Sequence, residues 1–106
     1  MLDKILQIEK KYNELGVTLS DPAVIQDYNK FRDLSKQRKS MEETVNLYYD
    51  WKKAVDAIDE AKELLKAEHD EEMRSFLKAE IENNEAKLPE YEEKMKVLLL
   101  PRDPMD

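Results

Sequence analysis

Three cations occur at helical spacing in a locally basic stretch of the chain. Arg32, Lys36 and Lys39 are separated by four and three residues, so a helix would place them on one face. Such a face suits a phosphate backbone or an acidic protein partner. The competing interpretation is an ordinary solvated face balanced by Asp27 and Asp33. We take the three cations as the candidate contact residues.

Residue types that support catalysis or metal binding are sparse. His69 is the only histidine, it stands among acidic residues at an expected corner, and the chain has no cysteine. Nucleophiles need an adjacent base and zinc sites need several nitrogen or sulfur ligands, so neither is predicted. The single glycine excludes a glycine-rich phosphate loop. We expect no catalytic residue, cofactor or metal, and interpret the many glutamates of residues 80–93 as a solvated face.

Composition predicts an all-α protein. Of 106 residues, 41% are charged and one is glycine, which is typical of a helical bundle or coiled coil. A net charge of −7 argues against generic nucleic-acid binding, although residues 21–40 carry five Lys and Arg against three Asp. We expect no specific DNA binding. No apolar run approaches the ~20 residues of a membrane span and no signal peptide is evident, so we expect a cytoplasmic protein.

A long helix is predicted over residues 28–68, which contain neither Gly nor Pro. Roughly forty residues at 1.5 Å each make a rod of about 60 Å, which needs partners along its length. The apolar spacing changes between Tyr48 and Trp51, where the stripe shifts around the helix. We therefore expect one helix to cover the first half and another the second. The stripe comprises Tyr28, Phe31, Leu34, Met41, Val45, Tyr48, Trp51, Val55, Ile58 and Leu65, with Arg38 in the seam.

A first helix is expected over residues 2–15, with Gly16 as a left-handed residue that ends it. Its apolar face comprises Leu2, Ile5, Ile8, Tyr12 and Leu15.

The connector to the long helix carries start signals. Asp21 precedes a proline, which predicts a short turn or helix over residues 22–26, and Asp27 can cap the long helix. Val24 and Ile25 are expected to tuck under the first helix. This connector reverses the chain.

The last helix is predicted to begin after Asp70 and to run to about Leu98. Pro89 lies inside it, so the helix either kinks there, which we favour, or breaks and restarts. Its expected seam is Met73, Leu77, Ile81, Asn84, Leu88, Tyr91, Met95 and Leu98. The predicted fold is an elongated antiparallel helical hairpin or three-helix bundle with one long central helix and coiled-coil-like packing.

The helical domain is expected to cover residues 1–97, and residues 98–106 to form an extended linker. Three leucines are followed there by two prolines that forbid helix. Leucines with nothing left to cover them suggest that the chain continues into a further portion.

Several stretches resemble the N-terminal helical domain of the bacterial peptide chain release factor 1 family, and the resemblance runs over all 106 residues. They are Leu-Ser-Asp-Pro at 19–22, Glu-Ala-Lys-Glu-Leu-Leu at 60–65, the corner at 70–74 and Leu-Leu-Leu-Pro-Arg-Asp-Pro-Met-Asp at 98–106. Pro89 departs from the family pattern, which puts the straightness of the last helix in question.

The resemblance implies a translation termination factor that reads the stop codons UAA and UAG on the ribosome and triggers peptidyl-tRNA hydrolysis. The family's codon-reading and Gly-Gly-Gln motifs lie in later domains and are absent here, so none of their residues is carried over. The chain would be a docking module for the large-subunit stalk base and GTPase-associated region, linked to the class II release factor. Arg32, Lys36 and Lys39 are the expected ribosome contacts, on charge alone.

Two other interpretations remain open on the sequence. One is a prefoldin-like coiled-coil chaperone or scaffold, and the other is the helical arm of an RNA-handling enzyme such as a seryl-tRNA synthetase. The trailing leucines and prolines argue against the first, and the net charge against the second.

Overall fold

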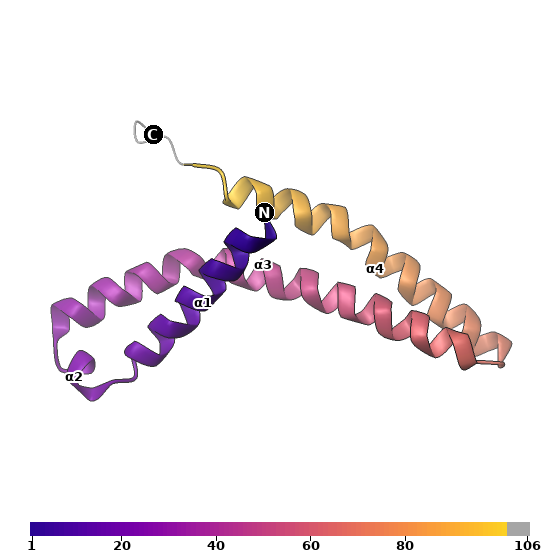
Figure 1. Cartoon of the computed structure of the whole chain (residues 1–106), viewed down its shortest axis with the longest axis horizontal. Coiled ribbons are helices and arrows are strands. Elements are labelled where there is room, and N and C mark those ends of the chain that lie inside the picture. Colours follow the sequence, from indigo (N-terminus) through magenta and orange to yellow (C-terminus); the bar gives the residue numbers. More distant parts are fainter. Residues whose placement is uncertain (102–106) are drawn as a thin grey trace. The chain divides into compact units, whose positions relative to one another are not determined.

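The computed structural model describes residues 1–101, and this part of the chain is all helical (Figure 1). Its elements are α1 (Leu2–Thr18), α2 (Pro22–Ile25), α3 (Tyr28–Ala67) and α4 (Glu71–Leu98). The all-α class and the long central helix are therefore confirmed. The expected linker lies mostly beyond α4, and residues 102–106 are outside the described part, so it stays a prediction.

The helices form two compact units, the N-terminal unit Met1–Asn46 and the C-terminal unit Leu47–Asp106. The long helix α3 runs without a break through the boundary and supplies part of each unit. The boundary lies next to Tyr48, where the sequence predicted that the apolar stripe changes direction. A different helix accompanies each half of α3: α1 in the N-terminal unit and α4 in the C-terminal unit.

The connector of the N-terminal unit is capped as the sequence predicted. The Asp21 carboxylate accepts a hydrogen bond from the backbone N–H of Ala23 at 3.0 Å, which starts α2. The Asp27 carboxylate accepts one from the N–H of Lys30 at 3.2 Å, which starts α3. Val24 is buried as expected, but Ile25 is exposed, because the short α2 turns only one side inward.

The prediction for Gly16 was wrong. The helix α1 continues to Thr18, and no described glycine has a positive φ. A Cβ at this position would lie 3.0 Å from Nη2 of Arg38. That guanidinium is held in place, because its Nε donates to the carbonyl of Tyr12 at 3.0 Å and it lies 3.8 Å from the centre of the Tyr12 ring. Gly16 thus provides room for a cation that ties α3 to α1.

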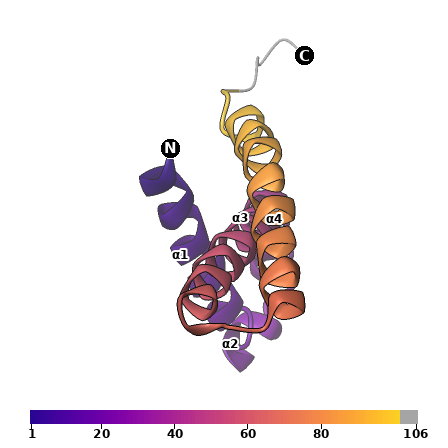
Figure 2. The same cartoon turned by 90° about the vertical axis from the view of Figure 1, so that its right-hand side faces the viewer.

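The C-terminal unit is an antiparallel hairpin of the second half of α3 and α4, joined by a short corner (Figure 2). Trp51 Nε1 donates to Glu92 at 3.3 Å, and Lys62 pairs with Glu85 at 3.5 Å. At the corner, the Asp70 carboxylate accepts from the N–H of Met73 at 3.0 Å, as predicted for the cap of α4.

The end of α3 is satisfied by a side chain from α4. Arg74 Nη1 donates to the carbonyls of Leu65 and Glu68 at 2.9 and 2.8 Å. These carbonyls belong to the last turn of α3 and to the corner, where helical partners are missing. The corner therefore closes without a left-handed residue.

The seam of the hairpin is formed partly by alanines. Ala54 and Ala61 are buried with Ile58, whereas Val55, which the sequence placed in the stripe, is only half-buried. Small side chains allow two helices to approach closely. The apolar stripe predicted from the sequence included only large residues and therefore omitted these alanines. On α4 the predicted seam is buried or half-buried from Leu77 to Leu98, and only its first member, Met73, is exposed.

Pro89 does not break α4. The helix is continuous from Glu71 to Leu98, so the alternative in which it stops and restarts is wrong. Pro89 and Glu85 are both exposed. In a regular helix the N–H of residue 89 would donate to the carbonyl of Glu85, but proline has no N–H, so water can hydrate this exposed carbonyl instead. Leu88 and Tyr91 keep the apolar stripe in phase.

We predict that Gly16→Ala destabilises the chain by about 1 kcal/mol, because the new methyl group displaces the Arg38 guanidinium from the Tyr12 carbonyl. In an Arg38→Ala background the same change should instead stabilise the chain by up to about 1 kcal/mol, because alanine has a higher helix propensity than glycine and no guanidinium is displaced. Urea unfolding followed by circular dichroism measures this double-mutant cycle. Equal effects in both backgrounds would contradict the proposed role of Gly16.

We predict that Arg74→Met destabilises the C-terminal unit by about 2 kcal/mol, because two helix-end carbonyls lose a charged donor. The matched control is Lys78→Met, since Lys78 is an exposed cation one turn along α4. Hydrogen exchange at the end of α3 measures the local effect. Identical exchange in both variants would refute the capping role.

Candidate functional site

The predicted contact residues lie on the part of α3 that belongs to the N-terminal unit. Arg32, Lys36 and Lys39 are all exposed, and the helical register puts them on one face. We call these three residues the basic face. The Asp27 cap fixes where α3 begins, and hence the register of this face.

Local contacts of the basic face are weak. Arg32 pairs with Asp33 at 3.1 Å, and Lys39 pairs with Glu42 at 3.0 Å. Lys36 forms no ion pair or hydrogen bond within the described residues. Exposed pairs of this kind contribute about 0–1 kcal/mol, so an anionic partner can exchange with them at small cost.

Tyr28 extends the same face, which the sequence analysis missed. It was placed in the buried stripe, but it is 76% exposed, and the Arg32 guanidinium lies 5.9 Å from its ring centre. Phe31, also placed in the stripe, is exposed as well. Both residues belong to the first turn of α3, where the neighbouring chain is the short connector. The sequence signal that could have placed Tyr28 on the basic face is its spacing of four residues from Arg32.

Arg38, another cation of the locally basic residues 21–40, has a different role. Arg38 is half-buried and contacts Tyr12 and Gly16 of α1, so it links α3 to α1. The locally basic segment therefore divides into outward cations that can bind and an inward cation that holds α1 and α3 together.

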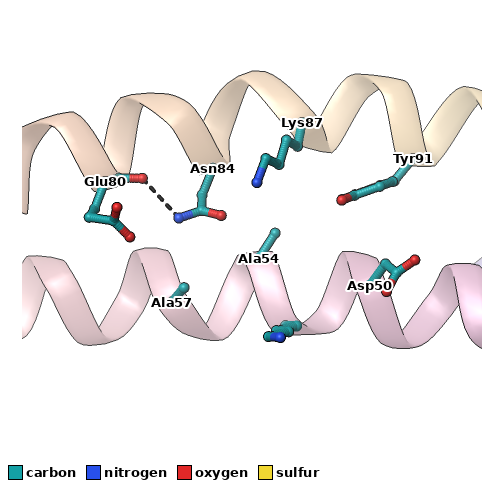
Figure 3. Close-up of a pocket in the computed structure, with 8 residues that line it drawn as sticks. Asp50, Ala54, Ala57, Glu80, Asn84, Lys87 and Tyr91 are labelled. Atoms are coloured by element: carbon teal, nitrogen blue, oxygen red, sulfur yellow. Dashed lines mark hydrogen bonds between the residues drawn. The ribbon is translucent and has the colours of Figure 1, made fainter.

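A polar groove of about 320 Å³ lies between the helices of the C-terminal unit (Figure 3). Lysines and carboxylates line it together, and the side-chain amide of Asn84 donates to the carbonyl of Glu80 at 2.9 Å. The alanines of α3 leave the space that the longer side chains of α4 enter. No nucleophile and base are paired there. Its lining is Asp50, Lys53, Ala54, Ala57, Glu80, Asn84, Lys87 and Tyr91.

The aromatic group of α3 is mainly structural. Tyr48 and Trp51 stack with ring centres 6.0 Å apart, and Trp51 also reaches Glu92 of α4. Tyr49 lies off the stripe and is exposed, with its ring 5.8 Å from that of Tyr48.

Groups that could carry chemistry are not brought together. His69 is exposed at the corner between α3 and α4. Within residues 1–101 no three His, Cys, Asp or Glu side chains are grouped so as to hold a metal ion. The pKa of Lys52 is raised above 10.5, first by its hydrogen bond to Asp56 and then by the charge of that carboxylate. The protonated form of this lysine is therefore favoured.

None of the helices described here combines the length and the apolar character that crossing a membrane requires.

Comparisons with known proteins agree on one family. The PCRF domain family matches residues 8–106. The chain is 41% identical over all 106 residues to peptide chain release factor 1 of Oceanobacillus iheyensis, and 42% identical to that of Halalkalibacterium halodurans. The match to release factor 1 of Streptococcus pyogenes serotype M5 is 41% over 105 residues. No solved structure matches the chain significantly.

The chain spans about 30% of the length of these relatives. The family match covers nearly the whole chain and includes α3, α4 and most of α1. It also agrees with the resemblance that the sequence itself showed. The chain therefore belongs to the PCRF domain family of peptide chain release factors.

Proposed function

We propose that this chain is the helical docking part of a peptide chain release factor that terminates translation at UAA and UAG. The family match and the identity of about 41% to release factor 1 of several bacteria support this function. With a single glycine the chain has no Gly-Gly-Gln motif, so peptidyl-tRNA hydrolysis and codon reading would belong to other parts of the whole factor. The chain would act in the cytoplasm.

The basic face is the proposed contact with the ribosome. It presents three exposed cations and the exposed ring of Tyr28 on one side of a rigid helix. Cations bind the phosphates of RNA, and an aromatic ring can stack on an unpaired base. The proposed site on the ribosome is the stalk base of the large subunit and the GTPase-associated region, with the class II release factor as a further partner.

The basic face is also energetically ready to bind. Lys36 would break no ion pair on binding, and the contacts of Arg32 and Lys39 are solvent-exposed ion pairs. Binding therefore requires little rearrangement of α3. An acidic protein would use the same cations but would gain little from Tyr28, which favours RNA as the target.

We predict that replacing Arg32, Lys36 and Lys39 by Glu weakens ribosome binding by at least about tenfold at low salt, and lowers the dependence of log K on log salt by up to about one per lost phosphate contact. The measurement uses a chimera in which this chain replaces the matching part of Oceanobacillus iheyensis release factor 1. Its affinity for ribosomes is measured over a series of salt concentrations.

The control chimera carries Glu in place of Lys78, Lys94 and Lys96, which are exposed on α4. It has the same net charge as the first variant but an intact basic face. Equal loss of affinity in both chimeras would show that net charge, and not the basic face, governs binding.

We predict that the chain alone releases no peptide from ribosomes stalled at a stop codon, because it lacks the Gly-Gly-Gln motif. The intact chimera should release it. The assay measures labelled peptide freed from a termination complex at saturating protein. Release by the isolated chain above the rate without any factor would refute the docking role.

A further inference from the structure

An apolar groove of about 230 Å³ lies near the corner of the C-terminal unit, whereas the basic face belongs to the N-terminal unit. Its floor and walls are contributed by α3 and α4. Two glutamates, Glu60 and Glu80, also line it. The apolar lining comprises Ala57, Ala61, Leu64, Phe76 and Leu77.

Large apolar side chains stand open to solvent at this groove. Leu64 is 54% exposed and Phe76 is 58% exposed, and they come from opposite helices. Met73, also exposed, lies three residues before Phe76 on the same side of α4. Single exposed apolar residues are common, whereas exposed apolar residues that gather at one place can mark an interaction site.

The rim of the groove is negatively charged. The carboxylates of Glu60 and Glu80 form no ion pair or hydrogen bond within residues 1–101. Residues 47–101 contain fifteen Asp and Glu against nine Lys and Arg, whereas residues 1–46 contain eight of each. The groove thus lies in the part of the chain that carries the excess negative charge.

This charge selects the kind of partner. A second copy of the chain would bring the same unpaired glutamates against each other, which costs free energy. A nucleic acid would be repelled by the rim. A partner with lysines or arginines beside apolar residues can pair with the glutamates of the rim and pack against the apolar lining.

We propose that this groove binds a basic amphipathic helix of a partner protein. A groove between two antiparallel helices can accept a third helix, whose apolar residues at three- and four-residue spacing enter between Leu64 and Phe76. Its cations then face Glu60 and Glu80. The proposal does not rest on the proposed function, which uses a face of opposite charge in the other unit.

The test uses the full chain and two synthetic helical peptides. Both carry leucines at alternating three- and four-residue spacing, and the other positions are lysine in one peptide and glutamate in its twin. Calorimetry measures affinity, and amide NMR locates the contact. We expect the lysine peptide to bind, the glutamate twin not to bind, and the NMR shifts to centre on Ala61, Leu64 and Phe76.

Matched variants locate the binding energy. Leu64→Ala with Phe76→Ala should weaken binding by at least about tenfold. The control Val97→Ala should leave affinity unchanged, because Val97 is another 58% exposed apolar residue of α4 that does not line the groove. Glu60→Gln with Glu80→Gln should weaken binding and flatten its salt dependence, whereas Glu82→Gln with Glu93→Gln should do neither.

Several results would overturn the proposal: no binding of the lysine peptide, equal loss with Val97→Ala, or shifts outside the groove. Self-association of the chain that Phe76→Ala abolishes would identify a second copy as the occupant and would also overturn it. Circular dichroism checks that each variant folds, and single Leu64→Ser and Phe76→Ser variants replace the double variant if it loses helicity. Glu replacements on the basic face should not weaken peptide binding, which separates this test from that of ribosome docking.

Discussion

The structure depends on covering one forty-residue helix along its whole length. In proteins, most of the stability of a helix comes from the packing of its apolar face and not from helix propensity, so α3 is stabilised mainly by the side chains that pack on it. Its apolar stripe changes direction near Tyr48, and no single straight neighbour can follow both parts of the stripe. As a consequence, α1 accompanies the first half of α3 and α4 the second half. This explains why one uninterrupted helix takes part in two compact units.

Much of this fold could be predicted because its decisive signals are local. Asp21, Asp27 and Asp70 each start a helix by accepting a backbone N–H two or three residues along the chain, and such contacts are readable from sequence. Gly16 could not be interpreted in this way. Its role depends on Arg38, which is distant in sequence and becomes its neighbour only after α1 and α3 pack. The buried alanines of α3 were missed for the same reason, since their burial depends on how closely α4 approaches.

The candidate site was predictable to the same extent. Helical spacing alone placed Arg32, Lys36 and Lys39 on one face, because all three belong to one element. Spacing could not separate these outward cations from Arg38, which turns toward Tyr12. It also could not show that Tyr28 remains exposed. The first outcome depends on the position of α1 and the second on the short connector beside the start of α3, and a pattern within α3 contains neither.

The distribution of charge adds a physical reason for two separate surfaces. The part of the chain before the unit boundary is balanced in charge, and the part after it carries the whole net charge of −7. An RNA-binding face would be weakened by nearby carboxylates, because they oppose the release of counterions that drives binding to phosphates. A groove that selects basic helices gains from the same carboxylates. The excess of acidic residues in the C-terminal unit therefore fits the two proposed surfaces, one for anionic and one for cationic partners.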